Sequence, residues 1–375
     1  MSLKRTIEEV GTKLFSCPTA PYKEFFVQEF AETFCNQHNI PNVRDQWGNI
    51  WVGTDSMPTK AKNSKLVFVA HMDHPGFHIR RIIKSGLWEA QWFGGGPTKK
   101  IKNAKVMMCE PTGSKISAKI KSFTLNATKT RVEKLVVQLD SKDNLSVTPT
   151  NFFGYYDFPG FIRRKTKIYT KAADDIGGVL MVLLLAQRLK SKSKKIREPF
   201  LGLLTRAEEV GFQGALGSVF SYRFPKHLNF ISVETSNYRA GAHMGAGPII
   251  RLGDRMTSFD PGLLFYMRKV ALWHSKNYPK FKYQTKLMDG GTCEASAFNL
   301  FNLKAAGLAV PLGNYHNEKD NGAPGPEFID INDVENLILL CETLVLKFDK
   351  KDFYWDAAKK ILKKSFIENK ARLKE

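Results

Sequence analysis

The sequence predicts an α/β protein, with a mixed sheet covered by helices and interrupted by an inserted β-rich segment. Short apolar strand-like runs alternate with helical patterns in both outer parts of the chain, which is typical of a mostly parallel or mixed sheet. Residues 76–165 instead carry many short strand-like runs and turn residues without a long helical pattern. We therefore expect a core of residues 1–75 and 166–375 and a β-rich insert of residues 76–165.

The elements before the insert are predicted in chain order as two helices and two strands. Apolar residues recur at helical spacing over residues 6–36, and the proline-containing stretch of residues 16–21 divides them into two helices. Strand patterns follow at residues 49–53 and 65–70. The second strand leads directly into His71-Met72-Asp73.

The α/β pattern resumes after the insert. The segment Asp174-Asp175-Ile176-Gly177-Gly178 opens a long apolar helix over residues 179–189. Strands are predicted at residues 200–205, 228–233 and 305–312. The last core element is a helix over residues 330–347, with Asp330 placed to cap its N-terminus.

The composition indicates the cellular compartment in which the protein is expected. The five cysteines among 375 residues are an odd number and widely scattered, which argues against a disulfide framework and for a reducing compartment. The first ten residues are charged rather than apolar, unlike a signal peptide, and no apolar run is long enough for a membrane helix. We expect a cytoplasmic protein without a membrane partner.

The net charge of +21 is the compositional anomaly. Lysines are spread along the chain without interleaved aromatic residues, so a solvated basic surface is favoured over nucleic-acid binding. Residues 190–197 are interpreted as a loop after a helix. Residues 353–375 place Ala357, Ile361 and Leu362 among lysines, which predicts a packed amphipathic helix, with membrane or partner binding as the lesser alternative.

Histidines and carboxylates follow the predicted strands. Because the C-terminal ends of parallel strands share one edge, the sheet should collect these side chains, while a carboxylate pair begins the apolar helix. The set is His71, Glu208, Glu209, Glu234 and His316 at strand ends and Asp174 with Asp175 at the helix start.

This set points to a pair of metal ions. So many carboxylates cannot share a low-dielectric cleft without a cation, and two divalent ions about 3.5–4 Å apart with a shared carboxylate would neutralise them. Mixed nitrogen and oxygen ligands suit zinc, with cobalt or manganese as substitutes. Consecutive side chains diverge, so one of Glu208 and Glu209 can bind metal while the other acts as a general base.

Each residue alone has a simpler interpretation. His71 alone is more often a structural histidine, Asp174-Asp175 a helix cap and Glu208-Glu209 a surface pair. The hypothesis of a metal site therefore depends on the joint pattern.

Several motifs in the same order resemble one enzyme family, the dinuclear-zinc glutamyl and deblocking aminopeptidases of metallopeptidase family 42, which include the cellulase M-like peptidases. The most specific is Glu-Glu-Val-Gly-Phe-Gln-Gly-Ala at residues 208–215. The others are Ala-His-Met-Asp at 70–73, Asp-Asp-Ile-Gly at 174–177, Val-Glu-Thr at 233–235, Gly-Gly-Thr at 290–292 and Tyr-His-Asn at 315–317. The resemblance implies a mixed-sheet zinc-peptidase core with an inserted barrel-like domain.

The resemblance also implies a role for each residue of the set. His71 and Glu234 would bind one metal ion, Glu209 and His316 the other, and Asp174 would bridge both. Glu208 would be the general base that activates a water bridging two zinc ions. Asp73 would orient the imidazole of His71.

Three positions depart from the family pattern. His74 stands where the family usually has Glu, Cys293 where it has Asp after Gly-Gly-Thr, and Glu234 where Asp is more usual. The ligand set survives all three departures.

The implied function is a metal-dependent aminopeptidase that hydrolyses N-terminal residues from peptides and self-associates into a homo-oligomer. The near alternative is a related dizinc carboxypeptidase or amide deacylase. The distant alternative is a basic nucleic-acid-binding or protein-binding module with a vestigial site.

Overall fold

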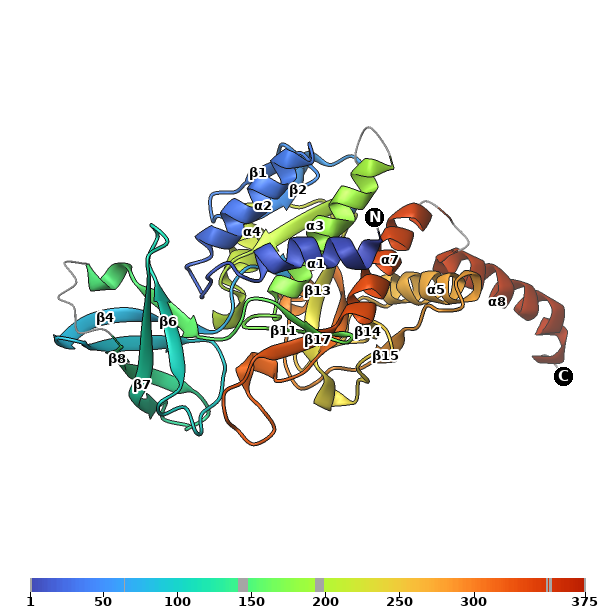
Figure 1. The fold of residues 1–375 in the computed structure, drawn as a ribbon. Coiled ribbons are helices and arrows are strands. Elements are labelled where there is room, and N and C mark those ends of the chain that lie inside the picture. Colours follow the sequence, from blue (N-terminus) through green and yellow to red (C-terminus); the bar gives the residue numbers. More distant parts are fainter. Residues whose placement is uncertain are drawn as a thin grey trace.

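A computed structural model of the chain describes residues 2–63, 65–140, 148–192, 199–348, 350 and 353–373. Its centre is an eight-stranded mixed sheet of order β1-β2-β12-β3-β13-β16-β14-β15. A closed six-stranded barrel follows β3 in the chain and projects from one end of the molecule (Figure 1). The predicted fold class, a mixed-sheet α/β core with a barrel-like β insert, is confirmed.

Four parallel strands form the middle of the large sheet. Strands β12, β3, β13 and β16 are parallel neighbours, so their C-terminal ends share one edge. β2 pairs antiparallel with β12, and β14 pairs antiparallel with β16. The strands are β1 (Asn42–Arg44), β2 (Ile50–Val52), β3 (Lys65–His71), β12 (Phe200–Thr205), β13 (Leu228–Asn237), β14 (Ile249–Arg251), β15 (Gln284–Lys286) and β16 (Lys304–Leu312).

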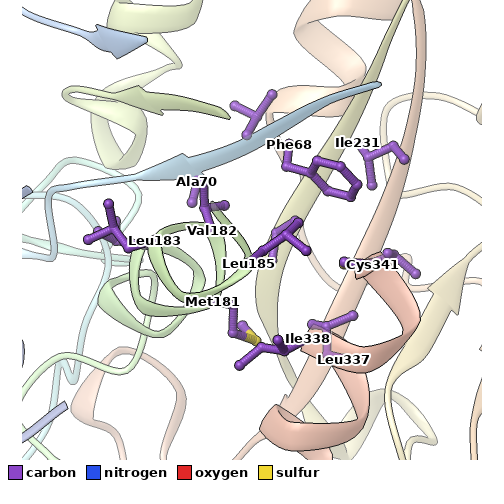
Figure 2. Close-up of a cluster of buried hydrophobic side chains, with 14 of the residues drawn as sticks. Phe68, Ala70, Met181, Val182, Leu183, Leu185, Ile231, Leu337, Ile338 and Cys341 are labelled. Carbon is purple, nitrogen blue, oxygen red and sulfur yellow. The ribbon is translucent and has the colours of Figure 1, made fainter. Parts of the chain in front are cut away.

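Helices cover both faces of this sheet. Helix α3 packs on β3, β12 and β13, and α1, α2 and α7 pack around α3. On the other face, Phe298 of α6 stacks on Phe230 of β13. Figure 2 shows the neighbouring Ile231 on the side of the sheet where Leu185 of α3 and Cys341 of α7 lie, as alternation along a strand requires. The helices are α1 (Leu3–Leu14), α2 (Phe25–Gln37), α3 (Ile176–Ser191), α4 (Gln213–Ser221), α5 (Pro261–Asn277), α6 (Glu294–Leu300), α7 (Ile331–Lys347) and α8 (Trp355–Asn369).

The core beneath the sheet is built by α3 and α7. Figure 2 shows Met181 of α3 beside Ile338 of α7, with Leu185 between these helices and Phe68 of β3. These side chains are buried, and each contributes about 1.5–3 kcal/mol of apolar burial. The apolar run that predicted α3 is thus buried nearly all round, so the helix fixes the position of Asp174 at its start.

The insert has its own apolar core. Its strands close in the order β4-β5-β8-β7-β6-β9, with Trp88, Ile120 and Val137 among the buried side chains inside. They are β4 (Gly76–Lys84), β5 (Leu87–Phe93), β6 (Lys105–Cys109), β7 (Lys115–Leu125), β8 (Val132–Leu139) and β9 (Phe153–Tyr156). We retain residues 76–165 as the proposed insert.

A small sheet joins the return from the barrel to the core. Strand β11 (Lys167–Thr170) pairs antiparallel with both β10 (Ile162–Arg164) and β17 (Glu327–Asp330). Short 3-10 turns complete the described elements. They are η1 (Pro58–Lys60), η2 (Pro149–Asn151), η3 (Glu208–Val210), η4 (Tyr238–Ala240), η5 (Tyr315–Asn317) and η7 (Lys370–Leu373).

Most predicted core elements are confirmed, including the helix pair before β1 and the cap of α7. The side chain of Asp330 caps α7 by accepting a hydrogen bond from the Asn332 amide. Of the predicted loop at residues 190–197, Lys190 and Ser191 still belong to α3, and residues 193–197 lie outside the described residues. Among the described residues, no helix combines the length and the apolar character needed to cross a membrane.

The prediction for the C-terminal tail was wrong in one respect. The amphipathic helix exists as α8, but it is not packed, because Ile361 and Leu362 remain 69% and 70% exposed. Amphipathic spacing predicts a helix and an apolar face, but it does not determine whether another element covers that face.

Candidate metal centre

Side chains from five separate segments converge at the C-terminal edge of the parallel strands. The large sheet brings the strand ends together, and α3 begins beside them. The convergent residues are His71 at the end of β3, Asp174 before α3, Glu208 and Glu209 in η3 after β12, Glu234 in β13 and His316 in η5 after β16.

The Asp174 carboxylate lies between the two histidines. Its Oδ1 is 3.4 Å from Nε2 of His71, and its Oδ2 is 3.6 Å from Nε2 of His316. An ion with tetrahedral bonds of about 2.0–2.2 Å separates its ligand atoms by roughly 3.4 Å. The observed distances therefore match two ligands of one ion on each side of Asp174.

Each histidine also faces glutamates. Nε2 of His71 lies 3.8 Å from Oε2 of Glu208 and 4.0 Å from Oε2 of Glu234. Nε2 of His316 lies 3.1 Å from Oε1 of Glu209. Apart from this contact, that oxygen is buried without a partner among the described residues. A buried carboxylate oxygen without a donor is favourable only if a cation or a proton approaches it.

The possible ligands form three groups, and within each group the ligand atoms lie within 4.8 Å of one another. One group is Asp174, Glu209 and His316, which contains the predicted ligands of one ion. The other two pair His71 with Glu208 and Glu209, or with Asp175 and Glu234. Asp175 was not a predicted ligand. Its carboxylate accepts from the amides of His71 and Gly178 at 3.3 and 3.1 Å and so caps α3.

Asp73 supports the site from behind. Its Oδ1 lies 3.5 Å from Nδ1 of His71, consistent with an orienting carboxylate. Its two oxygens also accept from the amides of Glu208 and Glu209, at 2.9 and 3.2 Å. One fully buried carboxylate thus fixes both the end of β3 and the turn that carries two acidic side chains.

The protonation of these side chains follows from burial and mutual charge. Burial raises the pKa of Glu208 well above its usual range, with Glu209 adding repulsion, and burial likewise raises the pKa of Glu234. Burial opposes protonation of His316, but Glu209 and Asp174 outweigh it and raise its pKa to about 9. Acids that retain protons and a histidine that gains one indicate a site with excess negative charge. A divalent cation would displace these protons and neutralise that charge.

Two supporting carboxylates were not predicted from the sequence. Glu327 of β17 accepts from the Asp174 amide at 3.0 Å and from the His316 amide at 2.7 Å, so it ties together segments on both sides of the site. Glu24 accepts from the Ala207 amide at 3.0 Å and from Arg206 Nε at 2.7 Å, and these two residues directly precede Glu208. No local pattern marks either residue, because both act through contacts remote in sequence.

His74 and Cys293, two of the three positions that depart from the family pattern, are buried and hydrogen-bonded. His74 is 2% exposed; its Nε2 lies 3.0 Å from Oδ1 of Asn317, and its Nδ1 contacts the Asp174 carbonyl oxygen. Cys293 is buried, and its amide donates to Asp254 at 3.0 Å. His74 therefore positions the segments that carry Asp174 and His316.

A pocket of about 340 Å³ opens over the centre, and its lining includes candidate ligands together with Arg239, Arg251 and Tyr315. Arg251 is 4% exposed, and its Nε is buried without a hydrogen-bond partner among the described residues. The barrel also reaches this region, because a Cβ on Gly95 would lie 2.1 Å from Nδ1 of His316. Only glycine fits at that contact.

The donors fit a divalent transition metal. Imidazole nitrogens and carboxylate oxygens converge in a buried cleft, which suits zinc and its close substitutes. Two histidines and a central carboxylate can divide between two ions, and Glu208 is near enough to exchange a proton with a group in the pocket.

Solved structures share this fold. A TET aminopeptidase from a marine sediment Thaumarchaeota archaeon superposes with a TM-score of 0.75 at 17% identity, covering 92% of this chain and 98% of that one. The TET1 peptidase of Pyrococcus horikoshii gives 0.71 at 22% identity, with 90% and 98% covered. An aminopeptidase from Desulfurococcus kamchatkensis gives 0.72 at 19% identity, with 92% and 95% covered. A family model described as M42 glutamyl aminopeptidase matches residues 48–340.

Proposed function

Because the chain belongs to the M42 glutamyl aminopeptidase family, and is thereby a metal-dependent aminopeptidase, we propose that it hydrolyses N-terminal residues from peptides with two zinc ions. The observation that carries this proposal is the Asp174 carboxylate between His71 and His316, at separations suited to shared ligands. The reaction class is hydrolysis of a peptide bond.

The proposed ligands divide into two sets around Asp174. His71 and Glu234 bind one ion, and Glu209 and His316 bind the other. The 3.1 Å contact between Glu209 and His316 supports the second set. The first set is looser, with 4.0 Å between His71 and Glu234. Cobalt or manganese could occupy the same donors.

Glu208 is proposed to move the proton. When bound, the ions polarise the peptide carbonyl and lower the pKa of water. Glu208 accepts a proton from the attacking water and passes it to the leaving amine. Burial raises the pKa of this carboxyl, which suits it to hold a proton between the two transfers, and Asp73 fixes its backbone amide.

The proposed preferred substrates are peptides whose N-terminal residue is acidic. Arg251 lines the same pocket as the candidate ligands, and its buried Nε has no hydrogen-bond partner among the described residues. A buried guanidinium forms stronger hydrogen bonds with a carboxylate than with a neutral acceptor. Arg251→Met should therefore lower kcat/KM for a glutamyl substrate much more than for a leucyl substrate. An unchanged ratio would refute this preference.

Assembly and compartment extend the proposal. The TET1 peptidase of Pyrococcus horikoshii assembles into a tetrahedron or a large octahedral shell, so we propose that this chain also forms a homo-oligomer. All five cysteines are free, which supports a reducing, cytoplasmic compartment. No nucleic-acid partner is proposed.

The decisive experiment pairs two neighbouring substitutions. Glu208→Gln should retain near two metal ions per chain by elemental analysis and lose about 10²–10⁴-fold in kcat. The matched control Glu209→Gln should instead lose metal along with activity. Full activity in Glu208→Gln would remove it as the base. Cleavage confined to blocked-amine peptides would favour the deacylase or carboxypeptidase alternative.

A further inference from the structure

Helix α8 is an exposed arm that the peptidase site does not use. It follows the end of the family match at residue 340 and lies beyond α5, at the end of the molecule opposite the barrel (Figure 1). Its first residue, Trp355, contacts Phe265 of α5 with ring centroids 6.4 Å apart. Every described side chain from residue 359 to residue 373 is exposed. The arm is therefore anchored at its start and free along its length.

One face of this arm is apolar. Trp355, Leu362 and Phe366 are spaced by seven and four residues, which places them on one side of a helix. Their exposed fractions are 41%, 70% and 58%, and Leu373 in the following turn is 79% exposed. Leaving such side chains in water is unfavourable, and a contiguous apolar stripe of this kind indicates a binding surface.

Outside this stripe the arm carries four lysines, together with the exposed Ile361 and Ile367. Lys359 and Lys363 border the apolar face, and Lys360 and Lys364 lie on the opposite side. Asp356 and Glu368 are the acidic residues of α8, and each lies near a lysine of the same helix at 3.7–3.8 Å. The binding partner should therefore combine an apolar phase with negative charge.

A second copy of this chain fits that requirement poorly. Its net charge of +21 opposes the approach of the lysines on α8, although copies of the chain can still associate through other surfaces. A cavity of about 1110 Å³ between α1 and α2 offers no net negative charge, because its lining contains Lys13 and Arg188 as well as Glu9 and Glu29. A bilayer with anionic headgroups meets both requirements.

We propose that α8 docks the peptidase on an anionic lipid bilayer, with Leu362 and Phe366 inserted among the acyl chains and Trp355 holding the start of the helix on α5. Lysine stems can extend along the interface so that their ammonium groups reach the headgroups. Each basic residue near an anionic surface adds to the attraction, which salt weakens. The sequence-based expectation of no membrane partner assumed a packed tail, and the exposed arm removes that assumption.

The test is co-sedimentation of the full-length protein with vesicles. Wild type should bind vesicles containing phosphatidylglycerol and not pure phosphatidylcholine, and binding should fall as salt rises. Leu362→Ser with Phe366→Ser should weaken binding by about tenfold or more. The matched control Phe220→Ser alters a side chain that is 67% exposed on α4, and it should bind as wild type does.

Charge reversal provides a second comparison within the arm. Lys359→Glu with Lys363→Glu should weaken binding more than Lys360→Glu with Lys364→Glu, since only the first pair borders the inserted face. Aminopeptidase activity should be unchanged in every α8 variant, which separates this proposal from the proposed function. No binding to anionic vesicles at low salt, or equal binding by the Leu362 and Phe366 variant, would overturn it. An altered oligomer mass without vesicle binding would assign the face to a second copy.

Discussion

The metal centre and α8 are both rich in charge, but they hold it in opposite ways. At the sheet edge, Asp73 is fully buried, and its oxygens accept from amides of another segment. On α8, Lys364 and Glu368 are in a solvated pair within one helix, and such pairs contribute about 0.3–0.5 kcal/mol. Buried charge depends on the whole fold, so single substitutions there should have large effects. Exposed charge should tolerate substitution and act mainly on partners.

The largest effect should come from Asp174→Asn. The variant removes the charge that both histidines share, so metal content should fall and kcat/KM should drop about a thousandfold or more. Elemental analysis and peptide hydrolysis measure the two losses. Asp289→Asn is the control, because Asp289 lines the same pocket without a predicted ligand role. Full metal content in Asp174→Asn would contradict the shared-ligand assignment.

A smaller effect is expected at Asp73, which lies behind the candidate metal ligands. Asp73→Asn keeps the size of the side chain but removes the charge that faces His71 and the amides of η3. Metal affinity should fall about 10–100-fold, as measured by competition with a chelator. An affinity equal to that of wild type would restrict Asp73 to a role in folding.

The sequence could predict which candidate ligands converge, because each follows a recognisable strand or begins an apolar helix. His71 and Glu234 occupy such positions, and their parallel strands bring them together. Glu24 and Glu327 could not be predicted, because their partners lie far away in the chain and no spacing relates them. The exposure of α8 could not be predicted either. Its apolar spacing correctly predicts a helix, but no other element among the described residues covers its apolar side chains.

Buried and exposed lysines should also differ in their effect on stability. Lys171 is 5% exposed and donates to the Phe15 carbonyl, and burial lowers its pKa to about 7 from 10.5. The unfolded chain holds that proton until about pH 10.5, so between pH 7 and pH 10 the unfolded state binds more protons and rising pH stabilises the fold.

Relative to Lys171→Met, the wild-type free energy of unfolding should therefore rise with pH, by up to about 1.4 kcal/mol per unit. Denaturant unfolding at a series of pH values measures it. Lys364→Met, on the exposed face of α8, should show no such difference from wild type. Parallel pH profiles for wild type and Lys171→Met would contradict burial of a titrating amine.

The last comparison is between two helices with the same kind of amphipathic pattern, and its exposed member should give the smallest effect of all. Leu337 on α7 is fully buried, whereas Leu362 on α8 is 70% exposed. Leu337→Ala should lower the free energy of unfolding by about 2–5 kcal/mol, because it opens a cavity beside α3. Leu362→Ala should change it by less than about 0.5 kcal/mol, because no packing is lost. Urea unfolding of both variants measures the contrast. A large loss in Leu362→Ala would mean that α8 is covered in solution, by the fold or by another copy, and would leave no free face for a bilayer.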